Sequence, residues 1–236
     1  MRRLVAATHL VLLVQARGYF PHAFGLYVVM VVGALLLLFS AEVARLVLPA
    51  FLVTEPGMLG VMAVAAHRYL ELGSGSVSAL HVSPLRPGEY LVALVLGSAV
   101  LATLGGAVTF VAVLGLDARL AWLIPVIFLF AVLSGLLGFA LSLRYRDFPR
   151  FILGMIPAVL LWQAPLLAVY DVVPTGLVAW IPSAPGILAL ASVCGGGGAP
   201  AAMMGWVVAG VGLTAVGVVV VQRIYQRHLH SGWELA

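Results

Sequence analysis

Residues 120–143 read LAWLIPVIFLFAVLSGLLGFALSL and contain no Asp, Glu, Lys or Arg. The hydrocarbon core of a bilayer is about 30 Å thick, and an apolar helix of about 20 residues is long enough to cross it. Three more stretches of similar size, 18–41, 90–116 and 151–170, also lack these charged residues. Four such runs in a chain of 236 residues predict an integral membrane protein built from helices.

The composition excludes a soluble globular domain. Apolar residues make up 64% of the chain and charged residues only 8%, whereas about a quarter of a soluble domain is charged. The net charge of +4 comes from arginines that flank the apolar runs, a pattern typical of membrane topology and headgroup contact rather than nucleic-acid binding. Cys194 is the single cysteine, which excludes an internal disulfide and a multi-cysteine metal site.

The order of apolar runs predicts an all-α membrane protein with one transmembrane domain over residues 1–236. An interfacial elbow helix is expected over 1–19, where His9, Gln15 and Arg17 interrupt a stretch too short to span the bilayer comfortably. Six transmembrane helices are expected to follow. They cover about 20–40, 55–72, 90–115, 120–143, 151–170 and 201–221.

Two further segments are expected on the outer side of the membrane. Residues 41–54 are expected to form a connection, because Thr54-Glu55-Pro56 has the pattern of a helix start, with Thr54 as the cap and Pro56 in the first turn. Residues 172–200 are interrupted by prolines and a glycine run, and they are expected to form a re-entrant or interfacial piece.

The distribution of arginines sets the expected orientation. With both termini inside, ten of the twelve arginines lie on the cytoplasmic side, and only Arg45 and Arg119 lie outside. This bias follows the positive-inside rule. We therefore expect a multi-pass protein of a plasma membrane, the bacterial inner membrane, with cytoplasmic termini.

The expected inner loop 71–90, ELGSGSVSALHVSPLRPGEY, is longer than a connection between two helices needs. One interpretation is a plain connecting loop that is rich in turn residues. The other is a short cytoplasmic helix that docks into a partner's groove, with Leu80 and Leu85 as apolar anchors and Arg86 as a polar contact. The residues alone leave both interpretations open.

Several motifs, taken in order, carry a family resemblance. They are RGYF at 17–20, TEPGMLG at 54–60, SAL at 78–80 and SPLRPGEYL at 83–91. With these motifs the chain resembles the membrane subunit of an ABC-2 type transporter, and it is most similar to actinobacterial fluoroquinolone export permeases. The match covers residues 10–190, and the P-L-R-P-x-E-Y-L stretch is its most specific part.

The resemblance implies the transmembrane fold of a type V exporter, with Arg17 at the end of the elbow helix. It implies that the 71–90 loop is a coupling helix against a separate ABC ATPase, with Glu71 at the base of the second span. The implied ATPase-facing turn is Ser83, Pro84, Leu85, Arg86 and Pro87. Further implications are two copies of the ATPase, a second permease that is identical or related, and efflux of hydrophobic or amphipathic cargo such as an antibiotic.

The chain itself is not expected to be an enzyme. A Walker A loop needs a lysine after its glycines to reach the phosphates of ATP, and this sequence contains no lysine. ATP and Mg²⁺ are therefore expected on the partner ATPase. No catalytic residue, cofactor or metal is expected in this chain.

Trp162, Gln163 and Tyr170 in the fifth expected span are candidate substrate-lining residues. Aromatic surfaces with a single amide suit a drug-like or lipid-like molecule. For any one of these residues, helix packing is the simpler interpretation.

His67 and Arg68 lie near the inner end of the second expected span. We expect Arg68 to snorkel to the inner headgroups, because a long side chain near a helix end can reach the interface. The alternative is a pairing with Glu71 that stiffens the span where it meets the 71–90 loop.

A secondary transporter or channel that works without an ATPase is the alternative function. It predicts charged residues at mid-membrane, whereas Glu55, Asp117 and Asp171 are expected near the outer ends of spans. An intramembrane enzyme is a third class, but the sequence shows no credible catalytic pair.

Overall fold

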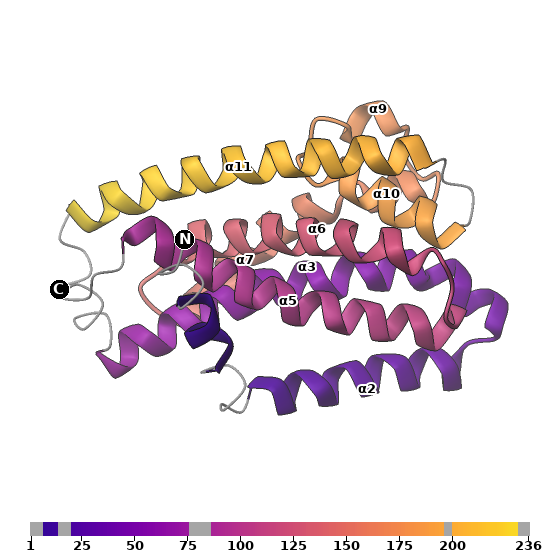
Figure 1. The fold of residues 1–236 in the computed structure, drawn as a ribbon, viewed down its shortest axis with the longest axis horizontal. Helices are drawn as coiled ribbons and strands as arrows, with labels where there is room; N and C mark the ends of the chain where they lie inside the picture. The colour runs from indigo at the N-terminus through magenta and orange to yellow at the C-terminus, as the bar shows by residue number, and fades with distance from the viewer. Residues whose placement is uncertain (1–6, 14–19, 76–85, 196–199, 231–236) are drawn as a thin grey trace.

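The computed structural model describes residues 7–13, 20–75, 86–195 and 200–230. Within these ranges the chain is helical and contains no strand (Figure 1). Residues 7–13 are helical. The other helices follow in the order α2 (Phe20–Leu38), α3 (Ala41–Ser74), α5 (Pro87–Leu114), α6 (Leu120–Ser142), α7 (Phe148–Gln163), α8 (Leu166–Val169), α9 (Thr175–Val178), α10 (Ala184–Gly195) and α11 (Pro200–His230).

Five helical stretches are long and apolar enough to cross a bilayer, so the chain is an all-helical, multi-pass membrane protein. They are Ala41–Ser74, Pro87–Leu114, Leu120–Ser142, Phe148–Val169 and Met203–His228. α2 contributes a shorter apolar stretch, Gly25–Leu38. A sixth crossing therefore stays a prediction, as does the interfacial placement of the elbow helix, whose Arg17 lies outside the described residues.

The expected boundary at residue 54 is wrong, because α3 is one continuous helix from Ala41 to Ser74. Ser40 caps it: the Ser40 hydroxyl accepts a hydrogen bond from the Val43 backbone N–H at 3.4 Å. Pro49 and Pro56 lie inside the helix rather than at its start. Ending a helix at membrane depth would leave backbone groups without water to bond, so a buried helix continues through a proline that its neighbours accommodate.

α6 lies at the centre of the bundle. It packs against α3, α5, α7, α10 and α11, and its Phe130 and Phe139 side chains are fully buried. In Figure 1, α11 runs along one side of the bundle and α2 along the opposite side, with α3, α5 and α6 between them. The apolar outer surfaces of α7 and α11 are largely exposed, as expected for helices that face lipid or another chain.

Two glycines bring α3 and α6 into close contact. A Cβ atom at Gly60 would lie 2.8 Å from the Ala131 carbonyl oxygen, and a Cβ atom at Gly138 would collide with the Val61 backbone. Small residues allow membrane helices to approach closely, and van der Waals packing then drives their association. The α3–α6 interface therefore depends on the absence of side chains at both positions.

The turn between α5 and α6 is tied to the end of α10. Asp117 Oδ2 and Arg119 Nη2 form an ion pair at 2.8 Å across this turn. The hydrogen bonds from Arg119 are the main cause of the lowered pKa of the Asp117 carboxyl. Arg119 Nη1 also donates to the Cys194 carbonyl oxygen at 3.1 Å, so one guanidinium satisfies a backbone acceptor at the end of α10.

The segment 172–200 contains short helices rather than one span. α9 and α10 lie within it, and α10 packs against α3, α6, α8 and α11. Ser183, just before α10, donates to the Trp162 carbonyl oxygen at 2.5 Å. The segment is thus bound to the bundle, and its re-entrant placement in a membrane stays a prediction.

Replacing Gly138 with Ala is expected to lower the thermal unfolding midpoint of the purified protein. The new methyl group meets the Val61 backbone, and overpacking of this kind costs about 1–3 kcal/mol. The matched control is Gly212→Ala on α11, where a Cβ atom would meet nothing within 4 Å. Equal midpoints for the two variants would show that the close α3–α6 contact is not important.

Candidate functional site at the α3–α5 junction

The last turns of α3 and the first turn of α5 form a polar cluster that we name the α3–α5 junction: His67, Arg68, Glu71, Glu89 and Tyr90. Glu71 is its centre. Its Oε1 lies 3.3 Å from His67 Nε2, one helical turn earlier, and its Oε2 accepts a hydrogen bond from the Tyr90 hydroxyl. The pairing with Glu71, the alternative to snorkelling, is therefore present for His67.

Arg68 does not snorkel toward the headgroups, and that expectation is wrong. Its side chain is 5% exposed, and Nη1 donates to the Ser142 carbonyl oxygen at 2.9 Å. Tyr69 donates to the same carbonyl at 3.2 Å and to the Tyr145 carbonyl at 2.8 Å. The C-terminal carbonyls of α6 lack hydrogen-bond donors within their own helix. Two side chains of α3 donate hydrogen bonds in their place.

An aromatic cluster lies beneath the junction and joins three helices. Tyr90 of α5, Phe139 of α6 and Tyr225 of α11 are all buried. The Phe139 and Tyr225 ring centroids are 5.1 Å apart at 89°, and Tyr90 lies 6.4 Å from each of the two. Edge-to-face packing of this kind adds to the stabilisation from burial. The aromatic cluster therefore holds α5 of the junction against α6 and α11.

The start of α5 is held by its own side chains and by α11. Glu89 Oε2 accepts from the Arg86 backbone N–H at 3.0 Å, and Pro87 occupies the first turn, where a missing N–H carries no cost. A Cβ atom at Gly88 would lie 2.7 Å from the Gln222 amide nitrogen of α11. The Arg86 side chain is exposed.

The expected coupling loop is shorter than its predicted bounds. α3 continues through Glu71 to Ser74, and Gly75, with φ of 71°, ends it by donating to the Leu72 carbonyl. Of the predicted coupling residues, Glu71, Arg86 and Pro87 belong to the two flanking helix ends. Leu80, Ser83, Pro84 and Leu85 lie outside the described residues.

The three candidate substrate-lining residues do not point into one described cavity. Trp162 Nε1 donates to the Ser134 hydroxyl of α6 at 3.1 Å, and the Tyr170 hydroxyl donates to the Leu46 carbonyl of α3 at 3.1 Å. Gln163, the last residue of α7, is half-buried. These contacts attach α7 and the segment after it to the bundle, and a lining role stays a prediction.

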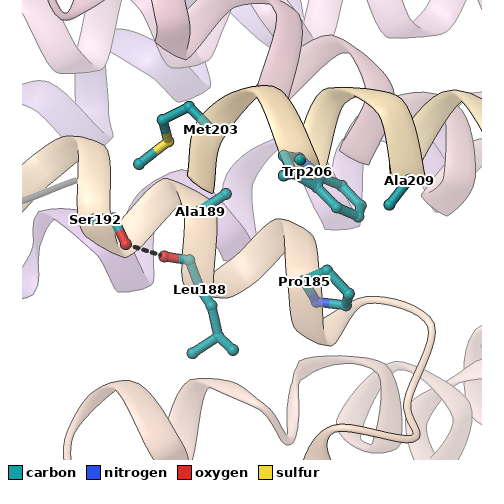
Figure 2. Close-up of a pocket in the computed structure, with 8 residues that line it drawn as sticks. Pro185, Leu188, Ala189, Ser192, Met203, Trp206 and Ala209 are labelled. Carbon is teal, nitrogen blue, oxygen red and sulfur yellow. Dashed lines mark hydrogen bonds between the residues drawn. The ribbon is translucent and has the colours of Figure 1, made fainter. Parts of the chain in front are cut away.

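A cavity of about 240 Å³ lies instead between α10 and α11 (Figure 2). Its walls include Leu188, Ala189, Met203 and Trp206, and the sequence offered no signal for it because these residue types also fill any apolar span. Trp206 is buried, and its indole N–H has no hydrogen-bond partner within the described part of the chain. The indole is thus a free donor beside an apolar cavity.

Sequence reasoning placed Glu55 near an outer helix end, and this placement is wrong. Because α3 begins at Ala41, Glu55 lies well inside the helix. Along the helix axis it is about 15 Å from Arg45 and about 18 Å from His67. No other charged residue occurs between these two positions. The carboxyl is 1% exposed and accepts from the buried Thr109 hydroxyl at 2.9 Å. An ionised acid at such a position costs about 2.5–3.5 kcal/mol.

No protein-family model, no curated protein and no solved structure matches the chain. The ABC-2 resemblance rests on the motifs in the sequence. Across the described ranges, no group of three or more His, Cys, Asp or Glu side chains is arranged to hold a metal ion.

Arg68→Gln is expected to lower the thermal unfolding midpoint, because the Ser142 carbonyl loses its buried charged donor and keeps only the longer bond from Tyr69. A hydrogen bond to a charged group contributes about 1.5–3 kcal/mol. Arg150→Gln is the control: its side chain is 73% exposed and pairs only across a surface turn with Asp147. A larger loss for the Arg150 variant would contradict the assigned role of Arg68.

Proposed function

We propose that the chain is the permease subunit of an ATP-driven exporter of the ABC-2 type. It moves a hydrophobic or amphipathic molecule, drug-like or lipid-like, out of the cell. The energy comes from a separate ATPase that docks on the 71–90 loop. Two copies of that ATPase, which bind ATP and Mg²⁺, act on this permease and on a second permease that is identical or related.

One observation supports this proposal most directly: the two ends of the 71–90 loop are bonded to each other. The Tyr90 hydroxyl of α5 donates to the Glu71 carboxylate of α3. Through Arg68 and the aromatic cluster, the same junction is joined to α6 and α11. A force on the loop would therefore reach four packed helices together, which suits rigid-body rocking of a transmembrane domain.

The proposed cargo follows from the apolar character of the helices. The cavity between α10 and α11 has mostly apolar walls, with the Ser192 hydroxyl and the Trp206 indole as polar groups, a combination that fits part of an amphipathic molecule. In the proposed orientation, the loop faces the cytoplasm of a bacterial cell and the Asp117–Arg119 turn faces outward. This assignment follows from the arginine bias of the sequence.

Leu85→Ala and Arg86→Ala are expected to weaken retention of the ATPase at least tenfold and to reduce transport in parallel. Truncating a hot-spot residue of an interface costs about 2 kcal/mol or more, and about 1.4 kcal/mol corresponds to a tenfold change in affinity. Co-purification of the ATPase and efflux from cells measure the two effects. Leu116→Ala, which removes an exposed side chain in the opposite turn, is the control. Unchanged retention and efflux in both loop variants would exclude the proposed coupling.

The position of Glu55 favours a second candidate function, an ion-coupled secondary transporter. Such proteins place ionisable side chains at membrane depth, and Glu55 is buried near the middle of α3. The two functions differ in their energy source. Uptake into vesicles that contain the purified chain alone, driven by a proton gradient without ATP, would favour the secondary transporter.

A further inference from the structure

Glu55 and Thr109 form a buried polar pair between α3 and α5. Glu55 is 1% exposed and Thr109 is 0% exposed. The Thr109 hydroxyl lies 2.9 Å from Glu55 Oε2, and Oε1 has no hydrogen-bond partner within the described residues. A buried carboxylate normally has several donors or a cation, and this one has a single neutral donor.

The helices packed against α3 provide no cation beside this carboxyl. Tyr27 of α2 is a phenol and carries no positive charge, and α6 has no titratable side chain from Leu120 to Ser142. The remaining titratable side chains on α2, α5, α7 and α10 are His22, Glu89, Tyr90, Arg150 and Cys194. None of these is a hydrogen-bond or ion-pair partner of Glu55 in the described structure.

From this geometry we infer that the Glu55–Thr109 pair is a proton-binding site between α3 and α5. In the conformation described, the acid carries its proton on the oxygen that lacks a partner. When water reaches the carboxyl, the O–H bond breaks, the proton passes to water and the carboxylate is hydrated. This step needs no oxidant or reductant.

Proton binding at this site makes the closely packed arrangement of α3 and α5 depend on pH. An exposed glutamic acid ionises at about pH 4.3, whereas the buried acid keeps its proton. Above that pH the hydrated state gains stability relative to the buried state, so a rise in pH favours the state in which water reaches Glu55. Glu55→Gln keeps the shape and removes the titrating proton, so it removes this pH dependence.

Infrared spectroscopy of the purified full chain in lipid tests the inference directly. A protonated carboxylic acid has a C=O stretching band that a carboxylate lacks. We expect this band at neutral pH in the wild-type protein, its loss in Glu55→Gln, and a shift of the band in Thr109→Val. Glu42→Gln, at the exposed start of the same helix, is the matched control and should keep the band.

A second measurement covers the case in which Glu55→Gln folds poorly. As pH rises above about 4.3, the unfolding midpoint of the wild type should fall, because the buried acid keeps a proton that the hydrated acid loses. Thr109→Val should shift the protonated-acid band whether or not Glu55→Gln folds. A spectrum without the protonated-acid band at neutral pH, or a band unchanged by Glu55→Gln, would overturn the inference. Neither readout involves an ATPase, so failure here is separate from failure of the coupling experiment.

Discussion

Backbone groups at membrane depth have no water to bond, and this constraint governs where each helix of the bundle continues and where it ends. α3 runs through Pro49 and Pro56 instead of stopping at the expected boundary. At one end of the bundle, Arg68 and Tyr69 supply donors to the terminal carbonyls of α6. At the other end, Arg119 supplies a donor to α10. Polar side chains thus gather where helices end, because backbone acceptors are left over there.

The same constraint explains how a small cluster can join the whole bundle. Glu71 and Tyr90 connect the ends of α3 and α5, and Phe139 and Tyr225 extend the contact to α6 and α11. The close approach of α3 and α6 leaves little space for either helix to move alone. A partner that pulls on the loop between α3 and α5 would therefore move several helices as one body.

Much of the helical framework could be predicted from charge-free runs, because crossing a bilayer requires about 20 apolar residues. The runs at 90–116 and 120–143 correspond closely to α5 and α6. The start of α3 could not be predicted in the same way. Thr54-Glu55-Pro56 has the residue types of a helix start, and only tertiary packing favours a start after Ser40 instead. Arg68 was misplaced for a similar reason: its partner at Ser142 is distant in sequence. The pairing of Glu71 with His67 was one of two alternatives, because neighbours one turn apart on a helix are visible in the sequence.

The central claim is that the 71–90 loop faces the cytoplasm, where an ATPase can reach it. Labelling of a single introduced cysteine tests this claim most directly. Cys194 is first replaced by Ser, and Ser83→Cys or Ala118→Cys is then added; Ala118 is exposed in the turn at the opposite end of the bundle. A membrane-impermeant thiol reagent applied to intact cells should label position 118, and it should reach position 83 only after the cells are permeabilised. Labelling of position 83 in intact cells would contradict the account.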